Sequence, residues 1–325
     1  MRLFLVLAAL VFILFLGALV IGPAGIGPIE SLRALVFGGE GPLPLVMQEI
    51  RLPRALLGLM IGAALGLAGA AMQGYLRNPL ADPGLIGVSG SAALGAVIAL
   101  QTGVAASTTL ALPFSALAGA VVGVVLVLVL AGPRGGSLTL ILAGIAISAL
   151  AGALTSLVLN LSSNPFAANE IVFWMMGSLA DRSMTHVWIA LPLILAGSLA
   201  LVTLGRGLDA LTLGEDAAEA MGVRLTRLRL VLIFGTAAVV GASTAVAGAI
   251  GFVGLVVPHV LRGFVGARPG RLLWASALGG AAMLLAADIA VRVVLPGRDL
   301  KLGVLTALVG APLFLHLIYR TRRAA

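Results

Sequence analysis

Long apolar segments separated by short polar ones make up most of the chain. A helix needs about 20 mainly apolar residues to cross the hydrocarbon core of a bilayer. Dividing the sequence at charges and turn residues gives ten apolar segments, most of them near that length. These segments are 3–22, 54–76, 83–100, 110–131, 138–160, 187–205, 228–250, 255–267, 272–295 and 302–319. The pattern predicts an all-α integral membrane protein of about ten transmembrane helices.

Three segments need separate treatment. The apolar segment 255–267 is short and contains Pro258 near its start, which predicts half a helix beside irregular backbone. Irregular backbone at membrane depth is tolerated only where protein buries it or where it lines a cavity. Residues 164–183 are expected to form a short extra helix on the membrane surface. The N-terminal run is longer than the apolar core of a cleaved signal peptide, so residues 1–22 are expected to remain as the first helix.

Composition supports the membrane class. Of the 325 residues, 61% are hydrophobic and 10% are charged, whereas soluble domains carry about 25% charged residues. The 43 glycines suit helices that pack closely in lipid, because small residues let backbones approach. Cysteine is absent, which excludes disulfides and thiolate metal sites.

The basic residues report on topology. A net charge of +8 would suggest a nucleic-acid partner in a soluble protein, but here the charges lie between apolar spans and no nucleic acid is expected. Loops on the cytoplasmic side of a bacterial inner membrane are enriched in Lys and Arg. Of the 20 basic residues, 13 lie on the N-terminal side and 7 on the other. With an even number of spans, this bias predicts that both termini are cytoplasmic.

The second and seventh predicted spans share a weak repeat at an offset of 179 positions. Because five helices separate them, the two copies run in opposite directions, as in the inverted-topology repeats of transporters. The repeat would relate helices 2–5 (54–160) to helices 7–10 (227–320), with helix 6 at 187–205 between them. The matching residues are Gly62-Ala63 with Gly241-Ala242, Ala68-Gly69-Ala70 with Ala247-Gly248-Ala249, and Leu76 and Pro79 with Leu255 and Pro258.

Motifs for catalysis are missing from the sequence. There is no phosphate-binding G-x-x-x-x-G-K-[ST] motif, so any ATP would be hydrolysed by another subunit. His186, His259 and His316 are scattered, which predicts neither a metal site nor a nucleophile–base pair. Asp288 is the only carboxylate well inside a predicted span, and it lies one turn before Arg292, its expected partner. Ion-driven carriers need more ionisable groups inside the membrane.

Polar strings at the ends of spans allow both structural and functional interpretations. The segment Arg51-Leu52-Pro53-Arg54 would either anchor the second span at the interface or dock an acidic partner. The string from Arg77 to Pro83 contains Asn-Pro and Asp-Pro, which break helices, and Asp82 is expected to cap a helix. The longest polar segment, 206–229, contains a predicted short helix at 213–222 that ends in a glycine.

Six strings in this chain, spread from about residue 45 to its end, resemble the signatures of the iron-chelate/haem/cobalamin permease family of ABC importers, the FecCD type. They are Arg51-Leu52-Pro53-Arg54; Gln73 with Arg77-Asn78-Pro79-Leu80-Ala81-Asp82-Pro83-Gly84-Leu85-Ile86-Gly87-Val88; Trp174-Met175-Met176-Gly177-Ser178-Leu179; Leu213-Gly214-Glu215 with Ala220-Met221-Gly222-Val223; Gly251-Phe252-Val253-Gly254-Leu255-Val256-Val257-Pro258-His259 with Arg262; and Gly310-Ala311-Pro312-Leu313-Phe314.

One string departs from the family. Where the family has Glu-Leu-Pro-x-Gly, this chain reads Asp299-Leu300-Lys301-Leu302-Gly303. Losing the proline puts the geometry of that outer turn in doubt, and Lys301 adds positive charge.

The resemblance implies a single permease domain over 1–325 that forms a homodimer with the translocation path on the dimer axis. Two ATPase subunits would bind on the cytoplasmic side, at residues 206–226, and one periplasmic binding protein on the outer side. ATP and Mg²⁺ would bind the ATPase, and this chain would bind no cofactor or metal of its own.

The resemblance also assigns roles to residues. Three arginines match those that meet glutamates of the binding protein: Arg51, Arg54 and Arg292. The match to the coupling helix that sits in a groove of the ATPase covers Leu213, Gly214, Glu215, Ala220, Met221 and Gly222. Residues that match family motifs and would have structural or gating roles are Gln73, Asn78, Pro79, Asp82, Trp174, Gly177, Ser178, Pro258, His259 and Arg262.

The expected function is therefore that of a permease subunit, without its own ATPase site, in an ATP-driven importer of the bacterial inner membrane. An iron chelate, either a siderophore or haem, is the favoured substrate. Cobalamin is the alternative within the family, and a stand-alone secondary carrier is a more distant one.

Overall fold

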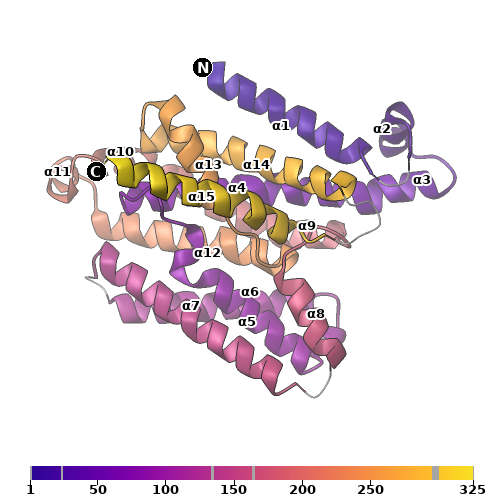
Figure 1. Cartoon of the computed structure of the whole chain (residues 1–325), viewed down its shortest axis with the longest axis horizontal. Helices are drawn as coiled ribbons and strands as arrows, with labels where there is room; N and C mark the ends of the chain where they lie inside the picture. The colour runs from indigo at the N-terminus through magenta and orange to yellow at the C-terminus, as the bar shows by residue number, and fades with distance from the viewer. Residues whose placement is uncertain (1, 23–24, 133–134, 163–164, 295–299, 325) are drawn as a thin grey trace.

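The computed structural model describes residues 2–22, 25–132, 135–162, 165–294 and 300–324, and every regular element in these ranges is helical (Figure 1). The elements are α1 (Arg2–Val20), α2 (Pro28–Phe37), α3 (Pro42–Leu45), η1 (Val46–Arg51), α4 (Leu52–Tyr75), η2 (Pro83–Ile86), α5 (Val88–Gln101), η3 (Val104–Ala106), α6 (Ala111–Ala131), α7 (Ser137–Asn160), α8 (Pro165–Met175), α9 (Met184–Thr203), α10 (Gly205–Leu211), α11 (Glu215–Ala220), α12 (Leu225–Ala247), α13 (Val253–Arg262), η4 (Gly263–Val265), α14 (Pro269–Val294) and α15 (Leu302–Ala324).

Each predicted apolar segment corresponds to one helix. Among the described residues, seven helical segments are long and apolar enough to cross a membrane: α1, α3–α4, α6, α7, α9, α12 and α14. Three shorter apolar helices, α5, α13 with η4, and α15, account for the remaining predicted segments. The all-α membrane architecture of about ten helices is therefore confirmed.

The irregular segments and the short helices agree in part with the predictions from the sequence. Residues 248–252 are irregular, as predicted for the approach to the short span, and Phe252 has a left-handed backbone with φ of 68°. The short helix α13 then begins at Val253, earlier than predicted, so that Pro258 lies inside it. The extra helix α8 is shorter than the predicted segment 164–183, and it packs against α5. Helices α2 and α3 in the long loop before α4 were not predicted.

The contacts between helices have the symmetry of an inverted repeat. In that repeat α4, α5, α6 and α7 correspond to α12, α13, α14 and α15. Helix α4 packs on α14, and its counterpart α12 packs on α6. Likewise α4 packs on α13, and α12 packs on α5. Each half therefore places its first helix between helices of the other half, which makes α4 and α12 the two central helices.

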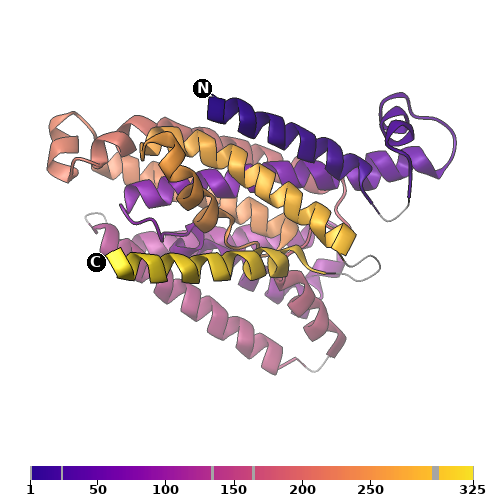
Figure 2. The same ribbon diagram turned by 45° about the horizontal axis from the view of Figure 1, so that its top comes forward.

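Glycines set the spacing between α4 and α14. A Cβ atom at Gly62 would overlap the backbone of Gly280, and one at Gly66 would overlap the carbonyl oxygen of Ser276. A substituted helix could not approach this closely, which is the role of small residues in membrane interfaces. Helix α1 lies at the edge instead, where it packs on α14 and leaves most of its surface exposed (Figure 2).

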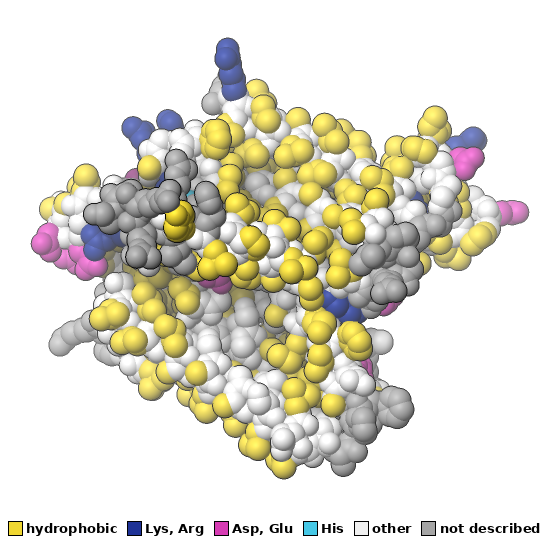
Figure 3. Space-filling model, in the orientation of Figure 1, with side chains coloured by type: hydrophobic (Ala, Val, Ile, Leu, Met, Phe, Trp, Pro, Cys, Tyr) yellow, Lys and Arg dark blue, Asp and Glu magenta, His cyan; other side chains and the backbone are white. Residues whose placement is uncertain are grey.

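The long helices run roughly along one direction, and the polar parts gather at the two ends of the molecule. Helix α11 and the C-terminal end of α15 lie at one end, and α2 with α3 at the other (Figure 1). On the face in Figure 3, apolar side chains cover most of the flank between these ends, and most acidic and basic side chains lie near the ends. This distribution suits a protein whose flanks face lipid.

Candidate functional site

An ion-pair network at the α2–α3 end joins three helices. Asp288 on α14 is buried and accepts a hydrogen bond from Arg54 Nε of α4 at 2.8 Å and further bonds from Arg292. The predicted Asp288–Arg292 pair is thus confirmed. Arg292 also donates to the carbonyl oxygens of Ala18 and Ile21, at 2.7 and 3.0 Å. These are carbonyls that the end of helix α1 leaves without an intrahelical partner.

Arg51 completes this network. Its guanidinium donates to the carbonyl oxygens of Leu19 and Val20, at 3.0 and 2.8 Å, and only 5% of the residue is exposed. Two arginines, Arg51 and Arg292, therefore hold the end of α1 against α4 and α14. Sequence reasoning expected interfacial anchoring as the local alternative for Arg51 and Arg54; the structure gives both of them internal partners instead. A docking role for the three arginines stays a prediction.

The side chain of Gln73 on α4 forms hydrogen bonds with α13, towards the end of the molecule opposite α2 and α3. Its side chain is buried, donates to the carbonyl oxygen of Leu255 at 3.1 Å and accepts from Arg262 at 2.9 Å. The two family strings that contain Gln73 and Arg262 are therefore in direct contact. His259 lies one turn before Arg262 on the same helix, and its Nδ1 is buried.

The turn after α4 is built by its own polar side chains. Asn78 Oδ1 accepts from the backbone N–H of Leu80 at 2.9 Å, and Asp82 Oδ1 accepts from that of Gly84 at 2.8 Å. Asp82 thus caps the short helix η2, which confirms the predicted capping role. Burial raises the pKa of the Asp82 carboxyl, while the bond from Gly84 lowers it. Pro79 follows Asn78 in this turn.

Helix α11 forms an exposed projection at the end of the molecule where α15 also ends (Figure 1). It spans Glu215–Ala220 and is shorter than the predicted 213–222. Gly222, two residues beyond its end, has a left-handed backbone with φ of 85°, as predicted for a closing glycine. Leu213 is 70% exposed and Met221 55% exposed, one on each side of the helix. Glu215 lies 3.7 Å from Arg77 of the turn after α4, and both side chains are about half exposed. The projection therefore exposes one apolar side chain beyond each end of α11 and acidic side chains along it.

A groove of about 590 Å³ runs along one face of α15 next to the end of α8. The backbone N–H of Gly303 donates to the carbonyl oxygen of Gly177 at 3.2 Å, and Ser178 N–H donates to the carbonyl of Ala247 at 2.7 Å. Trp174 lies beside this junction, since a Cβ at Gly248 would overlap its carbonyl oxygen. The lining is almost entirely apolar and consists of Met175, Met176, Ala249, Gly303, Val304, Ala307, Leu308, Ala311, Pro312 and Leu315.

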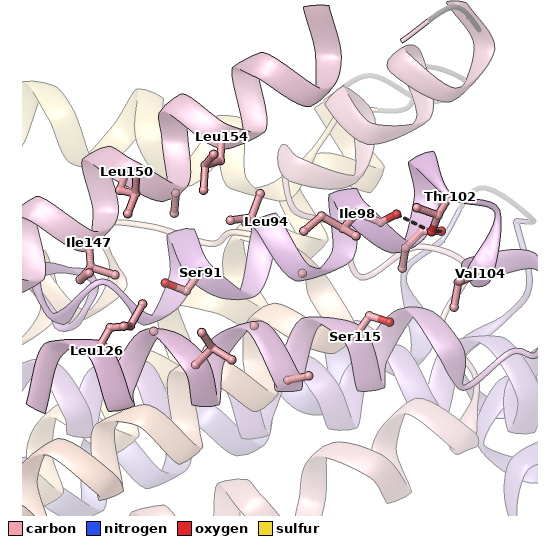
Figure 4. Close-up of a pocket in the computed structure, with 17 residues that line it drawn as sticks. Ser91, Leu94, Ile98, Thr102, Val104, Ser115, Leu126, Ile147, Leu150 and Leu154 are labelled. Atoms are coloured by element: carbon pink, nitrogen blue, oxygen red, sulfur yellow. Dashed lines mark hydrogen bonds between the residues drawn. The ribbon is translucent and has the colours of Figure 1, made fainter. Parts of the chain in front are cut away.

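A second apolar cavity, of about 440 Å³, lies between α5, α6 and α7 (Figure 4). Its polar groups are few, and one of them, the Thr102 hydroxyl, donates to the Ile98 carbonyl at 2.7 Å. Several of its lining side chains, such as Leu150, are also exposed on the flank. The cavity therefore has the character of the surrounding lipid rather than of a site for a polar solute.

The predicted site residues thus fall into separate groups rather than one centre. Arg51, Arg54 and Arg292 gather at one end, Gln73 and Arg262 meet at the other, and the motif around Gly177 borders the α8–α15 groove. Sequence reasoning missed that Arg54 binds Asp288, because 234 positions separate them. It also missed Arg229, which donates to the carbonyls of Gly132 and Gly135 in the turn between α6 and α7.

Comparison with known proteins gives consistent matches over most of the chain. The model of the FecCD transport family matches residues 9–320. The chain is 40% identical over 277 residues to the Fe(3+) dicitrate transport system permease protein FecD of Escherichia coli (strain K12), covering 85% of this chain and 86% of that protein. It is 38% identical over 288 residues to the vitamin B12 import system permease protein BtuC of Citrobacter koseri, covering 88% and 86%.

A solved structure gives the same result at the level of the fold. It is described as an inward-facing conformation of an ABC transporter of the metal-chelate type. It matches with a TM-score of 0.85 at 33% sequence identity, and the match covers 98% of this chain and 99% of that one. A match of this extent covers nearly the whole chain. The chain belongs to the FecCD transport family, and it is an ABC importer permease with several membrane spans.

Proposed function

We propose that this permease forms a homodimer in the bacterial inner membrane and moves a ferric chelate inward, powered by two ATPase subunits. The observation that carries this proposal is the α11 projection, whose exposed Leu213 and Met221 offer an apolar docking surface at one end of a chain that has no nucleotide-binding motif of its own. ATP and Mg²⁺ would bind the ATPase partner. Both termini would be cytoplasmic, which puts α11 on the side of the ATP.

The contacts of α11 supply a route for the mechanical step. Helix α11 packs against α10, which in turn packs against the central helix α4 and against α14. Asp209 on α10 accepts a hydrogen bond from the backbone N–H of Gly270, at the start of α14, at 2.7 Å. A push on α11 by the closing ATPase dimer would thus reach α4, one of the two central helices, and α14. We infer alternating access driven in this way from outside the chain.

The groove beside α15 supports a path between two copies of the chain. It is open on one side, so a second copy facing it would close it into a channel. Helix α7 lies on the same side of the molecule as α15 (Figures 1 and 2) and exposes several large apolar residues, among them Leu138, Leu142 and Leu157. A bulky chelate would fit such a wide and weakly polar path. One periplasmic binding protein would deliver it at the α2–α3 end.

The substrate has two candidates among the relatives. The similarity to the dicitrate permease favours a ferric chelate, and the similar identity to the vitamin B12 permease keeps cobalamin as the second candidate.

Reconstitution tests the proposal. The permease would be purified with its partner ATPase and binding protein and placed in proteoliposomes. Uptake of ferric dicitrate, ferric enterobactin and cyanocobalamin would then be measured with ATP. We expect uptake of a ferric chelate that requires both partners and ATP. Uptake of cyanocobalamin alone would select the second candidate, and uptake without the ATPase would contradict the mechanism.

A further inference from the structure

A pocket of about 390 Å³ lies between the end of α9, helix α10 and the start of α12, next to the segment that follows α11. Leu204 and Leu228 in its lining are buried, and Val231 is half buried. Two exposed arginines, Arg224 and Arg227, line it as well. The pocket therefore combines apolar side chains with two positive charges, at the end of the molecule where α11 lies (Figure 1).

These positive charges are not neutralised inside the pocket. None of the described residues that line it is acidic. The ion pairs between described residues involve the arginines at positions 54, 77 and 292 instead. Within the part of the chain that the structure describes, the guanidinium groups of Arg224 and Arg227 have no hydrogen bond to another side chain. The pocket is therefore suited to an anion.

An apolar groove of about 210 Å³ lies further along α12, where this helix packs with α6 and α9. Arg227, Val231, Phe234 and Ala238 follow one another at spacings of three or four residues, which places them on one face of α12. The first two line the basic pocket, and the last two line the groove. Helix α9 contributes to both linings as well. The pocket and the groove thus follow one another along the same pair of helices.

The groove is open to the flank of the molecule. Val121 and Val125 of α6 and Phe234 of α12 line it, and each of them is more than half exposed. Exposed apolar side chains on the flank of a membrane helix contact lipid chains. From Arg227 to Ala238, α12 rises about 16 Å, which is about half of the hydrocarbon thickness and so the depth of one leaflet. The two features together have the shape and chemistry of a lipid with a charged headgroup.

We propose that the pocket and the groove bind one anionic phospholipid from the leaflet at the α11 end, with its phosphate at Arg224 and Arg227 and an acyl chain along the groove. Basic pockets between membrane helices bind anionic headgroups, and a guanidinium group can donate two parallel hydrogen bonds to one phosphate. A soluble anion uses the pocket alone, so the continuous apolar groove selects a lipid. The inference does not depend on which solute the permease transports.

Native mass spectrometry of the purified full-length permease gives the first test. Delipidated protein in detergent would be titrated with dioleoyl phosphatidylglycerol, which is anionic, or with dioleoyl phosphatidylcholine, which is not. We expect wild type to bind one phosphatidylglycerol per chain in preference to phosphatidylcholine. Arg224→Gln with Arg227→Gln should remove this preference by weakening the binding of phosphatidylglycerol about twentyfold, or about fivefold for each arginine. Arg224→Lys with Arg227→Lys should retain most of the affinity.

The matched control for the charge change is Arg268→Gln with Arg271→Gln. These are two exposed arginines beside the start of α14 and outside the pocket. They lie at the same end, because Gly270 between them bonds to α10. This variant should bind phosphatidylglycerol as wild type does. Equal losses in the two glutamine variants would show a general attraction of the basic end for anionic lipid, and the proposed site would be wrong.

Filling the groove gives the second test. Val125→Trp places a bulky side chain in the groove and should weaken the binding of phosphatidylglycerol, whereas Val6→Trp, at an exposed valine on α1, should not. Equal binding in these two variants would contradict a role for the groove. Glycerol 3-phosphate, which has no acyl chain, should not displace the lipid at millimolar concentration.

Two further outcomes would assign the pocket to another occupant and overturn the proposal. Displacement of phosphatidylglycerol by glycerol 3-phosphate would mean that the pocket binds a soluble anion. An Arg224→Gln and Arg227→Gln permease that keeps its lipid but loses affinity for the ATPase would mean that the ATPase covers these arginines. The uptake measurements that test the proposed function are independent of both results.

Discussion

Arg54 Nε lies 2.8 Å from Asp288 Oδ1, which joins the start of α4 to the end of α14 across 234 positions of the chain. The same carboxylate also binds Arg292, so one acidic group is the charged partner of two arginines. Replacing it leaves both cations with an incomplete set of partners. Buried charges that lose their partner are strongly destabilising.

We expect Asp288→Asn to lower the free energy of unfolding by about 3–5 kcal/mol, measured by thermal or denaturant unfolding in detergent. Glu49→Gln, an exposed acid near the same end, is the matched control and should change little.

The docking hypothesis predicts a separate effect, on the affinity for the binding protein. If Arg54 docks the binding protein, Arg54→Glu should weaken binding most at low ionic strength while basal ATPase activity is retained. A well-folded Arg54→Glu permease with full affinity for the binding protein would argue against docking.

The contact between Gln73 and Arg262 gives a second prediction. Gln73→Leu preserves the volume but removes the acceptor of Arg262 and the donor to the Leu255 carbonyl. Unsatisfied buried groups cost about 1–3 kcal/mol, so unfolding should occur at lower temperature than in wild type. Gln48→Leu, at an exposed glutamine on η1, serves as the control. If Gln73→Leu and Gln48→Leu lower the unfolding temperature equally, the buried contact of Gln73 adds no stability beyond that of an exposed glutamine.

The glycines between α4 and α14 give a third prediction. Gly66→Ala adds one methyl group where Ser276 leaves no room, and overpacking of this kind costs about 1–3 kcal/mol. Gly90→Ala, inside α5, meets only ordinary contacts of 3.7 Å or more and should be neutral or stabilising by up to about 1 kcal/mol. The measurement is the unfolding temperature of each purified variant. The same change at both positions would contradict the packing argument.

Coupling to the ATPase gives a fourth prediction. Glu215→Lys reverses charge on the exposed helix α11, where an exposed ion pair carries little stability, so the permease should fold normally. We expect ATP hydrolysis that no longer drives uptake. A bulky residue at Gly214 should act similarly, but its φ of 108° adds backbone strain. Arg77→Gln removes the ion pair without changing α11 and is the control. Wild-type uptake in Glu215→Lys would rule out a coupling role.

Topology gives the fifth prediction. Reporter fusions at residues 210–220 and at the C-terminus should both report a cytoplasmic location, and fusions at 35–45 and 162–168 a periplasmic one. In the structure, α11 and the end of α15 lie at one end of the molecule and α2 at the other (Figure 1). The absolute orientation follows only from the bias in basic residues. A periplasmic C-terminal reporter beside a cytoplasmic 210–220 would require an odd number of spans.

The sequence by itself determined the class of protein, the approximate number of apolar spans and the family. Spanning helices satisfy their own backbone hydrogen bonds and must be apolar along a fixed length, so the segments can be read locally from composition. The turn structures could also be predicted, because the interactions that form them lie between neighbouring residues. Asp82 caps the residues directly after it, and Gly222 closes the helix directly before it.

Tertiary structure alone decided the partners of Arg51 and Arg54. Arg51 and Arg54 were expected at a surface, and the fold gives them the end of α1 and Asp288 as partners. The residues near Arg51 and Arg54 in the sequence do not determine these partners, because the partners lie on helices that pack together only in the folded bundle. Lys301 was visible in the sequence as a departure from its family, but its position over the ring of Phe173 depends on how α8 and α15 pack. Long-range partners are fixed by the packing of the whole bundle, which no single segment specifies.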